Sequence, residues 1–148
     1  MINRLEELEQ QYQQTPSNAI SKEETKMSLL EAERTSNNYR VSIKYLANEE
    51  TEEIIALQER ILDGFDFAIS NLFNVINESN YEEISRLVRF LRNKLQINMW
   101  ITETEKKNMY FKTKKNNKLP KENSLFVELF FVEKYQQLTG INLVKKNK

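Results

Sequence analysis

The chain has 148 residues, with 22 basic and 22 acidic side chains and neither cysteine nor histidine. This length predicts a single domain over residues 1–148 that can bury a core of its own. The missing residue types exclude disulfides, thiol nucleophiles, histidine general bases and Cys/His zinc sites. The two glycines, Gly64 and Gly140, cannot form a glycine-rich phosphate loop. We expect no cofactor and no bound metal.

Charge is distributed unevenly along the chain. Residues 1–64 carry 13 acidic and 7 basic side chains, a net charge of −6. Residues 106–148 carry 3 acidic and 11 basic side chains, a net charge of +8. This asymmetry predicts contact between the two halves of one chain, head-to-tail association, or a basic segment that meets an acidic partner.

Two further features of the composition concern location and source. No apolar run is long enough to cross a membrane, and the N-terminal residues lack the apolar stretch of a signal peptide. We therefore expect a cytoplasmic protein without membrane contact. Asparagine, lysine and isoleucine are abundant, as is typical of AT-rich coding sequence, which suggests a low-GC bacterium or one of its phages or mobile elements.

The first predicted element is a short helix over residues 1–14. Met1, Leu5, Leu8 and Tyr12 follow the 4-3-4 spacing of an a/d seam, and Pro16 ends the helix. So short a helix barely forms alone in water. The semi-independent segment 1–20 therefore needs a partner, either within the fold or in a homodimer.

A second helix is predicted over residues 22–47. Ser21 and Glu24 have the spacing of a capping box, and Met27 and Leu30 are the apolar residues that follow. Residues 39–46 alternate between apolar and polar, which also fits a strand. Helix is favoured there because no second strand is available to pair with it.

The clearest pattern is an amphipathic helix over residues 50–78 with a wide apolar face. Gly64 lies at the edge of this face, where a missing side chain lets another helix come close. Phe67 is the large apolar residue on the polar side. Glu59, Asp63 and Asp66 line that polar side and could bind Mg²⁺ through oxygen ligands, but a solvated helix face is the favoured interpretation.

Two more helices are predicted over residues 80–110 and 121–139. Asn80 opens the first of them, and Pro120 and Gly140 bound the second in the usual order. Because apolar residues surround the helix 121–139, it is either central in the core or covered by a partner. The predicted core centres on Ile54, Ile61, Phe65, Leu72, Ile84, Leu91, Leu129 and Phe130.

A basic connecting segment, residues 106–121, carries seven lysines with no acidic residue among them. Such a segment attracts phosphate, and aromatic rings within it can stack on unpaired bases. An acidic protein surface would suit the segment equally well, and a solvated segment without a partner is the favoured interpretation. The candidate nucleic-acid contacts, which include an arginine row on the preceding helix, are Arg86, Arg89, Arg92, Lys106, Lys107, Tyr110, Phe111, Lys112, Lys114, Lys115 and Lys118.

These observations predict an all-α protein, a single compact bundle of four to five helices. The favoured function is a non-enzymatic protein–protein interaction module, such as a small regulator, adaptor or inhibitor. The minor alternative to a non-enzyme is an acid- and metal-dependent activity. The other alternative is sequence-tolerant binding of RNA or single-stranded DNA. The candidate partner-binding residues are Phe67, Leu125, Phe126, Phe131 and Tyr135.

Overall fold

The computed structural model describes residues 4–17, 19–45, 52–112 and 121–143. The side chains of residues 4, 45, 54, 100–112 and 121–126 lie outside this description. The described residues form five helices and no strand, so the predicted all-α bundle is confirmed. The helices are α1 (Arg4–Gln13), α2 (Lys22–Tyr45), α3 (Glu52–Val75), α4 (Tyr81–Lys112) and α5 (Lys121–Thr139).

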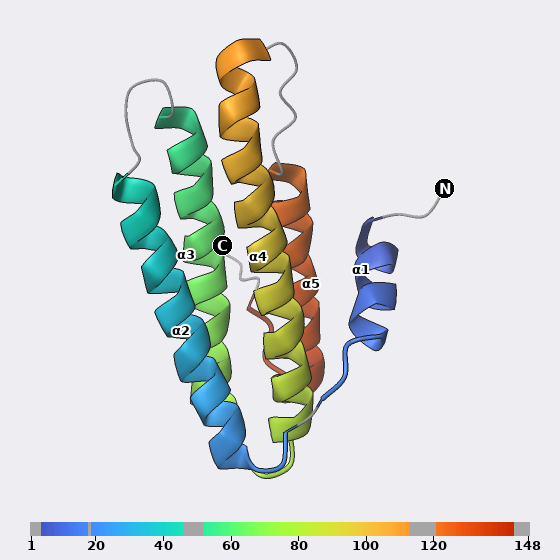
Figure 1. Ribbon diagram of the computed structural model, residues 1–148. Coiled ribbons are helices and arrows are strands. Elements are labelled where there is room, and N and C mark those ends of the chain that lie inside the picture. The colour runs from blue at the N-terminus through green and yellow to red at the C-terminus, as the bar shows by residue number, and fades with distance from the viewer. Residues whose placement is uncertain (1–3, 18, 46–51, 113–120, 144–148) are drawn as a thin grey trace.

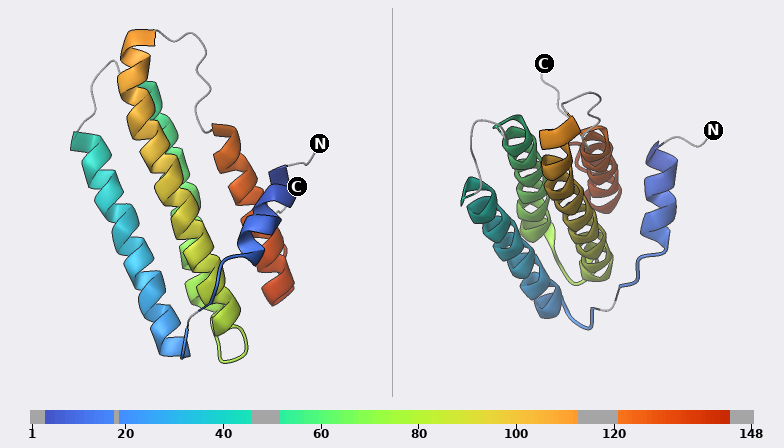
Figure 2. Two further views of the ribbon diagram at one scale, coloured as in Figure 1. Left: turned by 45° about the vertical axis from the view of Figure 1, so that its right-hand side comes forward. Right: turned by 45° about the horizontal axis from the view of Figure 1, so that its top comes forward.

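Helices α2 to α5 run side by side in alternating directions, and α1 lies outside them against α5 (Figure 1). Helices α2, α3 and α4 pack against one another, while α5 packs against α3 and α4. Helix α1 contacts mainly α5 and, to a lesser extent, α4 (Figure 2). The molecule is therefore a four-helix bundle with a peripheral fifth helix on one side.

The helix ends follow from local hydrogen bonding. The Ser21 hydroxyl accepts from the Glu24 N–H at 3.1 Å, while the Glu24 carboxylate accepts from the Ile20 N–H at 2.6 Å. The capping box is thus formed, although Glu24 reaches the residue before the cap. Gly140 ends α5 with φ of 79°, and its N–H donates to the Gln136 carbonyl at 2.7 Å.

The turn between α3 and α4 is closed by two asparagines. The Asn77 side-chain oxygen accepts from the N–H groups of Ser79 and Asn80 at 2.8 and 3.1 Å. The Asn80 side chain accepts from the Asn77 N–H and donates to the Val75 carbonyl. Asn80 precedes α4 as predicted, but its side chain caps the end of α3.

The core confirms six of the eight predicted central residues. Ile61, Phe65, Leu72, Ile84, Leu91 and Phe130 are all buried. Leu129 is 45% exposed, so the prediction was wrong there. Its neighbours Phe130 and Phe131 take the inward positions, which turns Leu129 outward. Ile54, the eighth residue, lies outside the described side chains.

Helix α2 is buried along a face that the sequence pattern did not indicate. Its buried positions include the polar residues Thr25 and Ser36, which interrupt the apolar pattern. Met27 and Leu30, the apolar residues singled out, are 64% and 48% exposed. The buried positions of α2 are Thr25, Leu29, Ala32, Ser36 and Ile43. Residues 39–45 are helical, so the strand alternative is wrong for them; residue 46 lies outside the described residues.

Candidate functional site

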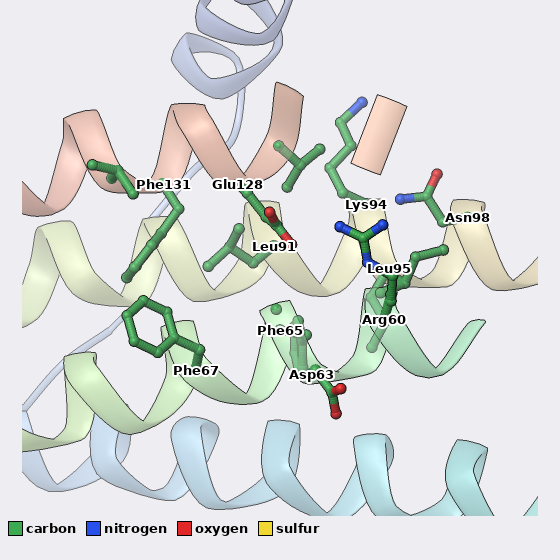
Figure 3. Close-up of a pocket in the computed structure, with 14 residues that line it drawn as sticks. Arg60, Asp63, Phe65, Phe67, Leu91, Lys94, Leu95, Asn98, Glu128 and Phe131 are labelled. Atoms are coloured by element: carbon green, nitrogen blue, oxygen red, sulfur yellow. The ribbon is translucent and has the colours of Figure 1, made fainter. Parts of the chain in front are cut away.

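A hollow of about 370 Å³ opens between α3, α4 and α5 (Figure 3). Its walls are mainly apolar and include Phe65 of α3, Leu91 and Leu95 of α4, and Val132 of α5. We call this space the α3–α5 hollow. It reaches the surface beside the exposed ring of Phe67.

Two aromatic rings define one end of the α3–α5 hollow. Phe67 of α3 and Phe131 of α5 point toward one another across it (Figure 3). Phe131 is 3% exposed, whereas Phe67 is 51% exposed. The hollow therefore has a buried aromatic wall and an exposed aromatic rim.

Gly64 places a carboxylate inside the hollow. A Cβ atom at Gly64 would lie 2.5 Å from Oε2 of Glu128 and 3.3 Å from its Cδ. The glycine thus leaves the space over α3 in which the Glu128 side chain of α5 lies. Gly64 was predicted to let another helix come close, but the atoms nearest to it belong to the end of the Glu128 side chain and not to a helix backbone.

Four charged residues line the hollow, but two of them direct their charge elsewhere (Figure 3). Asp63 points toward α2, where its carboxylate accepts from Arg40 at 2.8 Å. Lys94 points toward α1 and donates to the Gln11 side-chain oxygen. The two charges that face the hollow are Arg60 and Glu128.

Glu128 has an unusual environment for a carboxylate. Among the described residues it accepts no hydrogen bond and forms no ion pair within 4 Å. Burial raises the pKa of its carboxyl group, and the positive charge of Arg60 offsets part of this rise. A charged group that is partly removed from water and unpaired can gain from a ligand that brings a hydrogen-bond donor.

The predicted partner-binding residues fall into three groups. Phe67 lies on the rim of the hollow and is exposed, as predicted from its position on the polar side of α3. Phe131 and Tyr135 are each 3% exposed, so this chain itself buries them and they are not surface anchors. Leu125 and Phe126 belong to α5, but their side chains lie outside the described part.

A second cluster of aromatic and charged side chains holds α1 in place, and we call it the α1 junction. The rings of Tyr12, Phe90 and Phe130 pack together, with centroids 5.0 to 5.5 Å apart. The Arg86 guanidinium lies 4.5 Å from the Tyr12 ring centroid, and the Lys134 ammonium lies 4.9 Å from it. Tyr12 and Leu8 are buried, so the seam of α1 finds its partner within the chain.

The polar groups of the α1 junction are paired. The Tyr12 hydroxyl donates to Glu83, and burial together with this hydrogen bond raises the pKa of Tyr12. Arg86 donates from Nε to the Thr15 carbonyl at 2.9 Å. Lys134 forms an ion pair with Glu9 at 2.7 Å. The junction therefore uses its charges to fasten α1 and the chain that follows it.

The predicted arginine row does not form one basic face. Arg86 is committed to the α1 junction, and Arg92 lies 3.8 Å from Glu31. Arg89 is exposed, and with Arg92 and Lys94 it lines a second, more polar hollow of about 770 Å³. Lys94 was not among the predicted contacts.

Most of the lysine-rich segment lies outside the described residues or side chains. Helix α4 continues to Lys112, so its backbone carries Lys106, Lys107, Tyr110 and Phe111, whose side chains lie outside the description. Lys114, Lys115 and Lys118 lie outside the described residues. The prediction of nucleic-acid contacts along this segment stays a prediction.

The acidic face of α3 is partly occupied by a cation from the protein itself. Arg40 of α2 donates to Asp63 at 2.8 Å and to Asp66 at 2.7 Å, and these contacts raise the pKa of Arg40. Glu59 lies one turn further toward the start of α3. Across the described residues, no group of three or more acidic side chains is arranged to hold a metal ion. The ion pairs with Arg40 favour a structural role for Asp63 and Asp66.

Sequence reasoning missed Arg60 and Glu128. Glu128 had a visible signal, because it is the lone acidic residue within the apolar run 125–132 of α5.

No helix among the described residues is both long and apolar enough to cross a membrane. No family model, curated protein or solved structure matches this chain.

Proposed function

We propose that this protein is a non-enzymatic protein-interaction module, a small regulator, adaptor or inhibitor, whose α3–α5 hollow receives a side chain of its partner. The observation that carries this proposal is the 51% exposed ring of Phe67 on the rim of a mainly apolar hollow. Exposed aromatic residues beside a concave apolar surface are typical of the anchor points of protein interfaces.

The energetics support an interface at this place. Covering an exposed phenylalanine ring contributes roughly 1.5–3 kcal/mol when the ring passes fully from water into an apolar contact. Phe131, Leu91 and Leu95 already form a buried floor, so an incoming side chain needs no rearrangement of the core. A preformed floor keeps the cost of ordering the site small.

The experiment combines a neutral probe with a matched pair of variants. In an NMR titration of the labelled protein with 1-pentanol, the largest shifts are expected at the amides of Gly64, Phe67 and Phe131. Phe67→Ser should weaken this binding. Phe73→Ser is the control, because Phe73 lies on the same helix and is 37% exposed but does not line the hollow. Shifts spread evenly over the surface, or equal effects of both variants, would overturn the proposal.

A partner protein, once captured, is tested with the same pair. A partner that binds through the hollow should be lost with Phe67→Ser and retained with Phe73→Ser. Light scattering over a range of concentrations identifies the case in which the partner is a second copy of this chain. Strictly monomeric behaviour, without any partner that distinguishes the two variants, argues against the module.

A second candidate function is sequence-tolerant binding of RNA or single-stranded DNA. It is supported by the polar hollow beside Arg89, Arg92 and Lys94, none of whose lining residues is acidic. Glu31 and Glu7 nearby oppose it. Mobility-shift assays with a mixed-sequence oligonucleotide at low and high salt test this function. Binding should fall with salt at a slope of about −0.7 per phosphate contact, and Arg89→Gln should weaken it where Lys44→Gln does not.

A further inference from the structure

The unpaired carboxylate of the α3–α5 hollow distinguishes this site from a simple apolar depression. Asp63 and Lys94 point away from the hollow toward partners of their own, whereas Glu128 forms no hydrogen bond or ion pair with a described residue and feels Arg60 only through its charge. Its carboxylate lies between the aromatic end, at Phe67, and the polar end, at Arg60 (Figure 3). An apolar wall and one available acceptor are thus presented together.

Lysine and arginine side chains have the shape and charge that such a site accepts. Their aliphatic stems pack along apolar surface while the charged tip stays at its edge. A cation close to an aromatic ring is also attracted by the ring face. A stem laid between Phe67 and Phe131 would bring its ammonium or guanidinium group toward the Glu128 carboxylate.

Gly64 is what keeps the carboxylate in this position. Glu128 Oε2 occupies space only 2.5 Å from where a Cβ at Gly64 would stand. Any other residue at this position would push the end of the Glu128 side chain away from α3. The glycine therefore serves the position of a charge, in addition to the packing of α5 on α3.

Arg60 limits where a cation can be bound. It lies at the opposite end of the hollow and carries the same charge as a lysine or arginine ligand. Repulsion at that end favours a cationic tip that meets Glu128 from the aromatic side, away from Arg60. The two charges that face the hollow therefore attract a cationic ligand at Glu128 and repel it at Arg60.

We infer that the α3–α5 hollow selects a basic residue of the partner, a lysine or arginine whose stem packs between Phe67 and Phe131 and whose cation binds Glu128. This inference rests on the proposed function, since it names the chemistry of the partner at the same site.

The test uses three probes of equal chain length, n-pentylammonium, 1-pentanol and pentanoate, in NMR titrations of the full chain. We expect the ammonium to bind about three- to tenfold more tightly than the alcohol, and pentanoate to bind more weakly than the alcohol. Glu128→Gln should abolish the advantage of the ammonium over 1-pentanol. Arg60→Gln should increase the advantage.

Two further variants guard against indirect effects. Glu133→Gln is the matched control, because Glu133 is on α5 but is exposed and does not line the hollow. It should leave the preference intact. Gly64→Ala should reduce the preference by displacing Glu128 without removing its charge.

The outcomes separate this inference from the function on which it rests. If none of the probes binds at the hollow, both are overturned. If 1-pentanol binds but the ammonium has no advantage, or if Glu133→Gln removes the advantage as Glu128→Gln does, selection of a basic residue is wrong. The apolar interaction site would then stand alone.

Discussion

The α1 junction and the α3–α5 hollow are built from similar residues, but they differ in whether the charged groups are paired and the rings are buried. Both combine phenylalanine rings with charged side chains and involve α4 and α5. In the junction, Arg86, Lys134 and Glu83 each have a partner within the chain. In the hollow, the Phe67 ring is half exposed and the Glu128 carboxylate is unpaired.

This difference teaches how to separate groups that stabilise a fold from groups that remain available for binding. A paired polar group regains, through its hydrogen bond or ion pair, the hydration free energy that it loses on leaving water, whereas an unpaired group does not. The junction therefore fastens α1 to the bundle. The hollow retains apolar surface and charge that a ligand could cover.

The largest expected difference is between removing a ring from the α1 junction and removing a ring from the rim of the α3–α5 hollow. Phe90→Ala should reduce the free energy of unfolding by about 3–5 kcal/mol, because Phe90 is 2% exposed and contacts Tyr12 and Phe130. Phe67→Ala should change it by less than about 0.5 kcal/mol, since surface substitutions seldom matter more. Urea unfolding followed by circular dichroism measures both. Equal losses would mean that the rim of the hollow is part of the core.

A smaller effect is expected from removing the hydrogen bonds by which Arg86 holds α1. Arg86→Ala should destabilise the protein by about 1–3 kcal/mol, because the carbonyl groups of Tyr12, at the end of α1, and of Thr15, just after it, lose a charged donor. Hydrogen exchange should show a loss of protection mainly in α1, because α1 packs chiefly against α5 and α4. Arg89→Ala, an exposed neighbour on the same helix, is the control and should be nearly neutral. Uniform loss of protection in all helices would contradict a local role for Arg86.

Gly64→Ala tests the hollow with an effect of opposite sign. Alanine favours a helix over glycine by about 1 kcal/mol, and the three atoms nearest to a Cβ at Gly64 all belong to the flexible side chain of Glu128. We therefore expect the thermal midpoint to stay constant or rise while the preference for pentylammonium falls. A clear drop in the midpoint would show that Glu128 cannot move aside.

The smallest expected effect concerns the pH dependence of stability. Because burial raises the pKa of Glu128, the folded protein keeps this proton to higher pH than the unfolded chain. Ionisation therefore lowers stability as pH rises through the ordinary glutamate range toward neutrality, with Arg60 opposing the loss. Glu128→Gln should match or exceed the wild-type thermal midpoint at neutral pH and lose this advantage well below pH of about 4.3. A lower midpoint for the variant at neutral pH would mean that the carboxylate is stabilising.

The helices could be predicted from local signals because these signals act within a few residues. The Ser21–Glu24 capping box, the stop at Gly140 and the apolar face of α3 each appear in the sequence and in the structure. The buried face of α2 could not be predicted, because Thr25 and Ser36 occupy two of its inward positions. Apolar periodicity does not indicate a face whose buried positions are partly polar.

The site could be predicted only in part. The exposure of Phe67 could be predicted because a phenylalanine on the polar side of an amphipathic helix stands out. Phe131 and Tyr135 were chosen from a helix that is apolar all round, where sequence offers no basis for deciding which side faces the bundle. Their burial, and the exposure of Leu129, depend on how α5 lies against α1, α3 and α4.

Caps, breakers and periodicity in the sequence therefore set the order and approximate ends of the helices. The sequence by itself also determined that cysteine and histidine chemistry is excluded. Only the tertiary structure decided which charges are paired. Arg86 meets Thr15 and Arg40 meets Asp63 across long separations in the chain, whereas Glu128 is left beside Gly64 without a partner. The reason is that pairing depends on distances of a few ångströms between helices, and these are set by how the whole bundle packs.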